Sequence, residues 1–245
     1  MLEFHGETDI GKRRQLNEDS LFAGDGLFIV CDGMGGHKAG EVASKLASDV
    51  IASFVKRSDN DPELTWPYGF DPRITYDANR LTTAIKLANR IVFRKAISSD
   101  DYNGMGTTVV AVLVSPTRAE MTFGHVGDSR IYLIRGGTMT QLTKDDSWVN
   151  LVSPSDTAMM KNVLTKALGA REDVEFDVVG KPLEPGDVML LCSDGLTNML
   201  PDPAILETVS AHPGDVEAAC RALVARANEQ GGRDNVSVLL VRYGG

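Results

Sequence analysis

Short apolar runs that begin or end beside an aspartate are the feature that most limits how this chain can fold. Asp32 follows the run Leu27–Cys31, Asp194 follows a second such run, and Asp234 comes just before a third. Runs of this length that end in glycine or asparagine turns are typical of buried strands. A carboxylate at the end of a buried strand adds little to packing, but it is well placed to hold a metal ion.

Three carboxylates that come together raise one another's pKa unless a cation lies between them. Ligation by oxygen alone favours hard divalent ions such as Mg²⁺ and Mn²⁺. The alternative for each site taken singly is an ordinary turn, in which the aspartate bonds its own backbone. The same context at three separate places favours the metal hypothesis.

The hydrophobic pattern predicts an α+β fold, with antiparallel strands interrupted by two long consecutive helices. Two strands joined at Gly24-Asp25-Gly26 are expected over 19–32, and the second of them is apolar on both faces and therefore central. Further strands are expected at 107–114, 119–125, 130–135, 138–142, 187–192 and 236–241. Helices are expected at 41–56, 78–97, 202–210 and 215–229, with a short helix near 157–168 and an irregular stretch over 58–77.

Composition excludes several classes of function. The chain has 245 residues, 42% of them hydrophobic, and a formal net charge of −9. An acidic chain lacks the basic face needed to bind nucleic acid or an anionic membrane surface. The three cysteines form no CxxC motif, no secretory signal is evident, and no apolar run approaches 18 residues. We therefore expect a cytoplasmic protein that does not span a membrane.

Two further stretches carry groups that suit phosphate chemistry. Arg14 precedes Glu18 and Asp19 closely, and its planar guanidinium could hold two phosphate oxygens beside an acidic metal cluster. The alternative is a solvated charge run. Asp128 lies at a strand junction and could be another metal ligand or a turn residue. His37, in a glycine-rich loop, could protonate a leaving group, or be an exposed histidine without a role.

In this order, the motifs resemble the metal-dependent Ser/Thr protein phosphatases of type 2C, in the bacterial branch of that family. The matching segments cover nearly the whole chain: Thr8-Asp9-Ile10-Gly11 with Arg14 and Asn17-Glu18-Asp19, Val30 to His37, Gly104 to Thr108, Gly127 to Arg130, Leu164 to Gly169, Leu191 to Leu196, and Gly232 to Ser237. The resemblance implies one catalytic domain over 1–245. It also implies a four-layer α-β-β-α sandwich, in which two central antiparallel sheets are flanked by helix pairs.

The resemblance also implies a role for each site residue. Asp32 would bridge two Mn²⁺ or Mg²⁺ ions, and the main-chain carbonyl of Gly33 would join the second ion. Asp194 and Asp234 would complete the first ion's ligands, and Asp128 would hold a third, weaker ion together with Asp194. The remaining roles are phosphate binding by Arg14 and contacts through metal-bound waters by Glu18 and Asp19.

The sequence departs from the family pattern at three places. The family commonly has Asp-His-Ser after Leu-Thr-x, whereas residues 142–147 here read Leu-Thr-Lys-Asp-Asp-Ser. The segment from Trp148 to Lys161 is shorter than the usual flap beside the active site. The irregular stretch 58–77 is longer than in compact bacterial members of the family. The first two bear on substrate selection and on affinity for the third ion.

The leading hypothesis is hydrolysis of phosphoserine and phosphothreonine in proteins by a metal-activated water, which would reverse the work of a partner Ser/Thr kinase. One alternative is a non-catalytic phosphoprotein-binding module of the same fold. Another is a hydrolase of small phosphate esters or nucleotides, although no phosphate-binding loop or dinucleotide motif supports it. Turnover of a phosphopeptide distinguishes the enzyme from the binding module, and a kcat/KM preference for the small substrate over phosphoprotein would indicate the third hypothesis.

Overall fold

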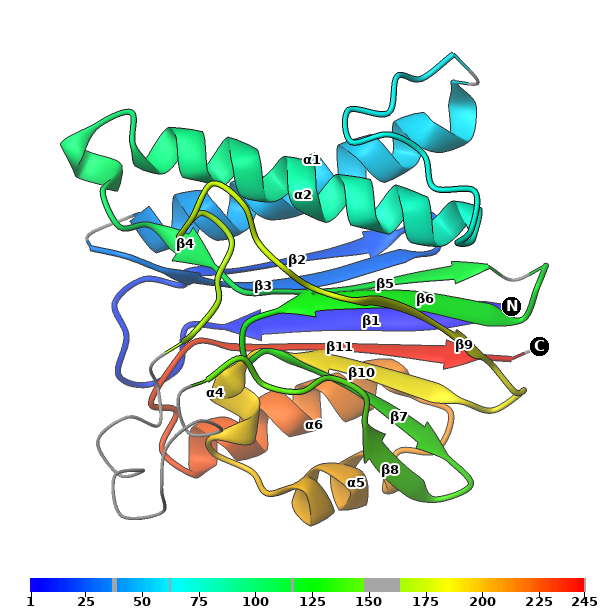
Figure 1. Cartoon of the computed structure of the whole chain (residues 1–245). Coiled ribbons are helices and arrows are strands. Elements are labelled where there is room, and N and C mark those ends of the chain that lie inside the picture. The colour runs from blue at the N-terminus through cyan, green and yellow to red at the C-terminus, as the bar shows by residue number, and fades with distance from the viewer. Residues whose placement is uncertain (37–38, 62, 116, 148–163, 245) are drawn as a thin grey trace.

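Two antiparallel sheets stack face to face, with helices on both outer faces (Figure 1). The computed structural model describes residues 1–36, 39–61, 63–115, 117–147 and 164–244. This arrangement confirms the four-layer α+β sandwich expected from the sequence.

The first sheet has the strand order β1-β11-β10-β7-β8, and it joins the two ends of the chain. Its strands are β1 (Leu2–Asp9), β7 (Arg130–Arg135), β8 (Thr138–Gln141), β10 (Val188–Cys192) and β11 (Val236–Tyr243). In the register of β1 with β11, Leu2 lies opposite Tyr243 and Asp9 lies opposite Val236. The segment that follows β1 is thereby held beside the residues that precede β11.

The second sheet has the order β2-β3-β5-β6-β9, and the short β4 pairs with the end of β3. Its strands are β2 (Asp19–Gly24), β3 (Leu27–Met34), β4 (Gly106–Thr107), β5 (Val109–Ser115), β6 (Glu120–Val126) and β9 (Val178–Pro182). The turn from β2 to β3 is the predicted hairpin. Asp25 and Gly26 have φ of 52° and 76°, the positive values that a two-residue turn of this kind requires.

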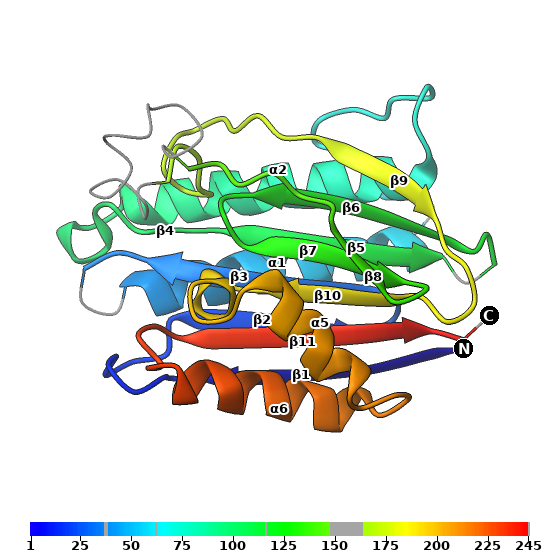
Figure 2. The same cartoon turned by 90° about the horizontal axis from the view of Figure 1, so that it is seen from below.

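The helices divide between the two outer faces. The second sheet is covered by α1 (Ala39–Asn60) and α2 (Tyr76–Ala96), and the short 3₁₀ helix η1 (Asp100–Tyr102) follows α2. The first sheet is covered by α4 (Asp194–Thr197), α5 (Asp202–Ser210) and α6 (Val216–Glu229), as the view from below shows (Figure 2). Thr75 caps α2 by accepting a hydrogen bond from the backbone N–H of Ala78.

Successive side chains of β3 point to opposite faces of its sheet, so this strand contributes to two layers of the core. Phe28 and Val30 point between the two sheets and pack with Leu191 and Leu239, while Ile29 packs against α1 and α2. All five of these side chains are fully buried. A strand that is apolar on both faces must lie inside its sheet, and β3 indeed lies between β2 and β5.

Some elements differ from the sequence-based expectation. The strand predicted over 107–114 is divided at Thr108 into β4 and β5, although the Thr108 backbone N–H still donates to the Asp32 carbonyl of β3. The short helix predicted near 157–168 falls partly outside the described residues, and its described part is not helical. Leu168 instead exchanges two backbone hydrogen bonds with Thr107, which keeps that segment extended. The sequence analysis did not predict β1, β9 or α4.

Candidate active site

Seven of the residues singled out in the sequence line one pocket of about 490 Å³, although they come from distant parts of the chain. These residues are Arg14, Glu18, Asp32, Gly33, Asp128, Asp194 and Asp234. The pocket lies where the end of β3, the turn between β6 and β7, the start of α4 and the segment before β11 meet.

Backbone pairing fixes Asp32 and Gly33 at this edge. The Asp32 backbone N–H donates to the Thr108 hydroxyl (3.0 Å), and its carbonyl accepts from the Thr107 hydroxyl (2.8 Å). The Gly33 N–H donates to the Glu18 carbonyl at 3.1 Å. A Cβ on Gly33 would lie 2.1 Å from the Gly40 carbonyl oxygen, so only glycine allows this close approach.

Arg14 and Asp234 form a two-pronged ion pair at the pocket, although 220 positions separate them. Arg14 Nη2 lies 2.8 Å from Asp234 Oδ2, and Arg14 Nε lies 2.8 Å from Asp234 Oδ1. This hydrogen bond raises the pKa of Arg14, which therefore stays charged. In this structure Asp234 faces a cation of the protein itself, and the two groups expected to bind metal and phosphate are in direct contact.

Asp19 is not part of the pocket lining but lies buried next to it. Its side chain is 8% exposed, and one carboxylate oxygen accepts a hydrogen bond of 2.8 Å from Ser193 Oγ. Burial raises the pKa of Asp19 to about 7, although hydrogen bonds from Ser237 and Ser193 act in the opposite direction. Asp19 is therefore held in place behind the pocket lining by Ser193.

The acidic side chains of the pocket destabilise one another's charged forms. Burial raises the pKa of Asp32 well above its ordinary value, and the nearby charges of Asp19, Asp194, Asp234 and Asp128 raise it further. Burial and then Asp234 raise the pKa of Asp194. For Asp128, burial followed by Asp194 and Asp145 raises the pKa to about 7. The pocket therefore holds more negative charge than the protein itself compensates.

Three buried carboxylate oxygens near the pocket have no hydrogen-bond partner among the described residues: Glu18 Oε1, Asp19 Oδ1 and Asp194 Oδ1. A buried oxygen without a donor is costly, and here each belongs to an acidic residue of the predicted site. Among the described residues, however, no three acidic, histidine or cysteine side chains form a ready ligand cluster. Asp234 is engaged by Arg14, so the site as it stands supplies suitable ligand oxygens without a closed ligand shell.

Two expectations fall outside the described residues. His37 is one of them, and the segment from Trp148 to Lys161, expected to form a shortened flap, is the other. Asp146, which belongs to the departure from the family pattern at 142–147, lies within the described residues. Its side chain accepts a hydrogen bond from the Gly127 N–H and lies 3.7 Å from Lys166 Nζ. Asp146 thus connects the turn that carries Asp128 to the opposite wall of the pocket.

The sequence matches the family model described as Protein phosphatase 2C over residues 10–239. The chain belongs to the protein phosphatase 2C family. It is 37% identical to the serine/threonine phosphatase stp of Listeria innocua, over 96% of this chain and 93% of that protein. It is also 37% identical to the serine/threonine protein phosphatase PstP of Mycobacterium tuberculosis, covering 98% of this chain but only 45% of PstP.

Solved structures of this phosphatase family have the same fold. The crystal structure of the Mycobacterium tuberculosis phosphatase PstP/Ppp superimposes with a TM-score of 0.84 at 32% identity, over 100% of this chain and 99% of that one. The crystal structure of the catalytic domain of PstP in complex with two manganese ions superimposes with a TM-score of 0.82 at 33% identity, over 98% of this chain and 97% of that one. The chain is therefore an enzyme of a metal-dependent phosphatase family.

The sequence analysis missed one residue that organises the site. Asn235 is 4% exposed, and its side chain accepts from the Glu18 N–H (2.8 Å) while donating to the carbonyls of Ile10 (3.0 Å) and Leu16 (2.9 Å). It fastens both ends of the segment that carries Arg14. Its position directly after Asp234, before an apolar run, was the available signal, because a buried asparagine must find several hydrogen-bond partners.

Proposed function

We propose that this protein hydrolyses phosphoserine and phosphothreonine in other proteins, and that the pocket around Asp32 is where this takes place. The observation that carries the proposal is the convergence of Asp32, Asp128, Asp194 and Asp234 with Arg14 around one pocket. Membership of the protein phosphatase 2C family supports the same reaction.

The residues fit two Mn²⁺ or Mg²⁺ ions. Asp32, Asp194 and Asp234 with the Gly33 carbonyl would hold them, Glu18 and Asp19 would act through water, and Asp128 would hold a third ion more weakly. The fit rests on the unpartnered buried oxygens and the raised carboxylate pKa values, which a divalent cation would relieve. When bound, such ions supply Lewis acidity and a deprotonated water near neutral pH.

The protein's own groups bind and orient the substrate. Arg14 is a permanently charged guanidinium at the pocket, about half exposed, and its fork matches two phosphate oxygens. Its ion pair with Asp234 keeps it in place in the absence of substrate. Asn235 fixes the segment on either side of Arg14, so the guanidinium is presented by an anchored loop.

Replacement of Asp32 tests this proposal. We expect Asp32→Ala to reduce Mn²⁺-dependent phosphate release from a phosphothreonine peptide by several orders of magnitude, because it removes the central ligand. Asp32→Asn serves as the matched control for folding. It removes a carboxylate that neighbouring acidic groups repel, so the metal-free variant is expected to be at least as stable as wild type while remaining inactive. Near-wild-type activity of either variant would refute the assignment.

The same assay separates the remaining hypotheses. A binding-only module would retain a phosphopeptide without releasing phosphate, and a small-ester hydrolase would prefer para-nitrophenyl phosphate to the peptide by kcat/KM. We also propose that a cognate Ser/Thr kinase phosphorylates the substrates and that both enzymes act in the cytoplasm. Within the described part of the chain, no helix has the length and apolarity needed to cross a bilayer.

A further inference from the structure

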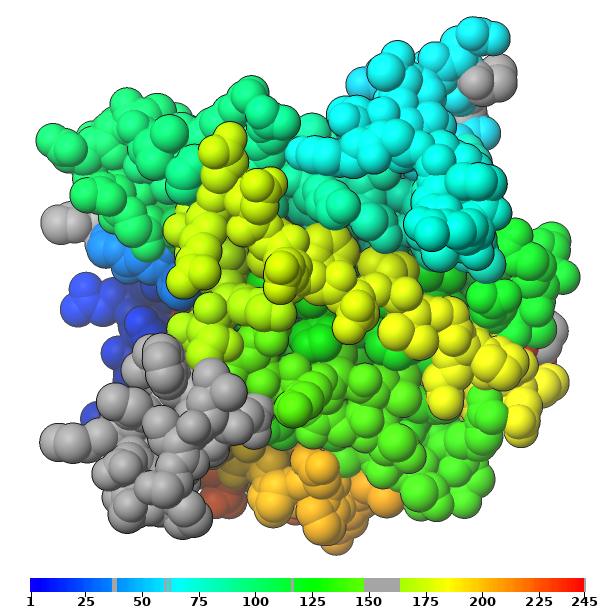
Figure 3. Space-filling view, in the orientation of Figure 1, coloured from blue at the N-terminus to red at the C-terminus, as the bar shows by residue number. Residues whose placement is uncertain are grey.

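A second hollow, here called the side groove, adjoins the catalytic pocket. It has a volume of about 280 Å³, and it shares Thr165, Lys166, Ala167 and Ala170 with the lining of that pocket. Its other lining residues are Arg171, Asp173, Val174 and Glu175. In the space-filling view the segment that carries them runs over the surface between α2 and the sheets (Figure 3). A peptide bound at the catalytic pocket would have the side groove next to it.

The segment that forms the side groove is firmly held. Asn89 of α2 is 2% exposed, and its side chain accepts from the Gly169 N–H (2.9 Å) and donates to the carbonyls of Arg171 (3.1 Å) and Glu172 (2.8 Å). Gly169 has φ +86°, and a Cβ there would lie 2.4 Å from Val92 Cγ1. The backbone on either side of the Arg171 side chain is thus fixed against α2.

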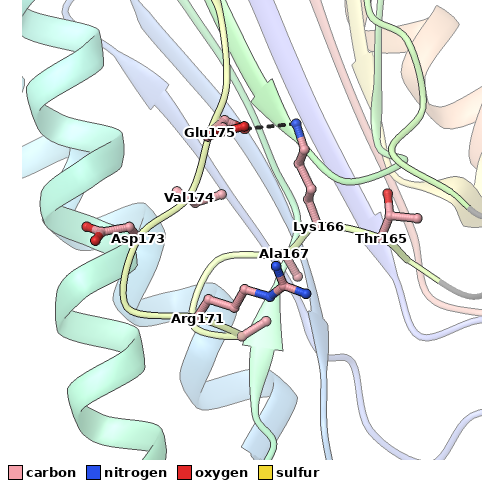
Figure 4. A pocket seen from close by; sticks show the side chains of 8 residues that line it. Thr165, Lys166, Ala167, Arg171, Asp173, Val174 and Glu175 are labelled. Carbon is pink, nitrogen blue, oxygen red and sulfur yellow. Dashed lines mark hydrogen bonds between the residues drawn. The ribbon is translucent and has the colours of Figure 1, made fainter.

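The charged groups of the side groove differ in what they bind. Lys166 Nζ donates to the Glu175 carbonyl at 3.1 Å, so part of its hydrogen-bonding capacity is used. The Arg171 guanidinium is exposed and has no ion pair or hydrogen bond with any described residue. Figure 4 shows it reaching across the side groove toward Ala167, whereas the carboxylate of Asp173 points to the opposite side. Within the described part of the chain, Arg171 is thus the cation of the side groove whose donors are not engaged.

We infer that Arg171 determines specificity by binding an acidic side chain close to the phosphorylated residue of the substrate. A guanidinium with unused donors, mounted on an anchored backbone, matches a carboxylate in two-pronged geometry. The inference rests on the proposed function, since it concerns peptides dephosphorylated in the adjoining pocket. It names the substrate class as phosphopeptides with a flanking glutamate or aspartate.

The test measures kcat/KM with Mn²⁺ for phosphothreonine peptides that carry a single glutamate at each of the three positions on either side, against an all-alanine parent. Wild type is expected to favour at least one glutamate peptide by about two- to fivefold, the range of an exposed ion pair. Arg171→Ala should bring that ratio to one and leave hydrolysis of para-nitrophenyl phosphate unchanged, since that ester has no flanking residue. Arg171→Lys should give an intermediate ratio, because it keeps the charge but loses the fork.

Arg57→Ala is the matched control, because Arg57 is an exposed arginine on α1 outside both hollows. It should leave the peptide preference as in wild type. Two results would overturn the inference while leaving the phosphatase assignment intact. One is an unchanged glutamate preference in Arg171→Ala, and the other is an equal loss of activity toward every peptide and the small ester. Wild-type protein inactive on all substrates would refute the proposed function instead, and this inference with it.

Discussion

Asn235 offers a direct test of how the site is held together, because its side chain makes three hydrogen bonds to the segment that carries Arg14. Asn235→Ala would leave the Glu18 N–H and two carbonyls without their partner. A hydrogen bond contributes about 1 kcal/mol net, and an abandoned buried group costs somewhat more, so we expect a loss of about 2–4 kcal/mol in the free energy of unfolding.

The effect on activity should exceed the effect on folding. Displacement of a positioned group by about 1 Å can cost about 10²-fold in rate, and Asn235 fixes both ends of the segment that presents Arg14 and Glu18. We expect Asn235→Ala to lower kcat/KM for a phosphopeptide by at least about tenfold at a temperature where the variant is folded. Urea unfolding of the metal-free protein and Mn²⁺-dependent phosphate release measure the two quantities separately.

Asn79→Ala is the matched control. Asn79 is also 4% exposed, and its side chain accepts from the Asp71 N–H (2.8 Å) and donates to the carbonyls of Asp71 (2.8 Å) and Thr75 (3.1 Å), away from the pocket. It should lose a similar free energy of unfolding and keep its activity. The reasoning fails if both variants lose activity to the same extent, or if Asn235→Ala costs less than about 1 kcal/mol.

Two further predictions concern charged groups in the pocket and next to it. The pKa of buried Asp19 is raised to about 7, so its stabilising contribution is complete below its unfolded value near 3.8 and is lost as pH rises through 7. The metal-free protein should therefore lose about 2 kcal/mol from this group between pH 5.5 and 7.5, and Mn²⁺ should raise the Tm more at pH 7.5. A Tm increment from Mn²⁺ that is equal at both pH values would contradict this. Arg14→Ala should reduce kcat/KM by about 10²-fold and weaken inhibition by inorganic phosphate, and an unchanged inhibition constant would argue against phosphate binding by Arg14.

Local signals in the sequence were enough for the elements whose pattern is decided within a few residues. The turn at Asp25 and Gly26 and the long helices α1 and α2 are of this kind. The missed strands are at sheet edges, where β1 mixes Glu, His and Gly with few apolar residues and β9 is largely exposed. Their pairing is decided by distant partners rather than by their own composition.

The site shows the same division between local and distant information. The acidic residues of the site could be predicted from the turns in which they lie, because an aspartate next to a short apolar run can be recognised from the sequence alone. The pairing of Arg14 with Asp234 and the bonds of Asn235 across 217 positions or more could not be foreseen, since they exist only after the chain ends meet. The groove beside the pocket likewise depends on the contact of Asn89 with residues about 80 positions away.

The pairing of β1 with β11 has a consequence for biosynthesis. β1 is synthesised long before β11, its neighbour in the sheet, so this contact of very high sequence separation must form late. Until then β1 is an unpaired edge that invites association with other chains. A chain cut short before residue 234 would lack both the neighbour of β1 and Asp234, the carboxylate proposed as a metal ligand, so we expect activity only after β11 has been made.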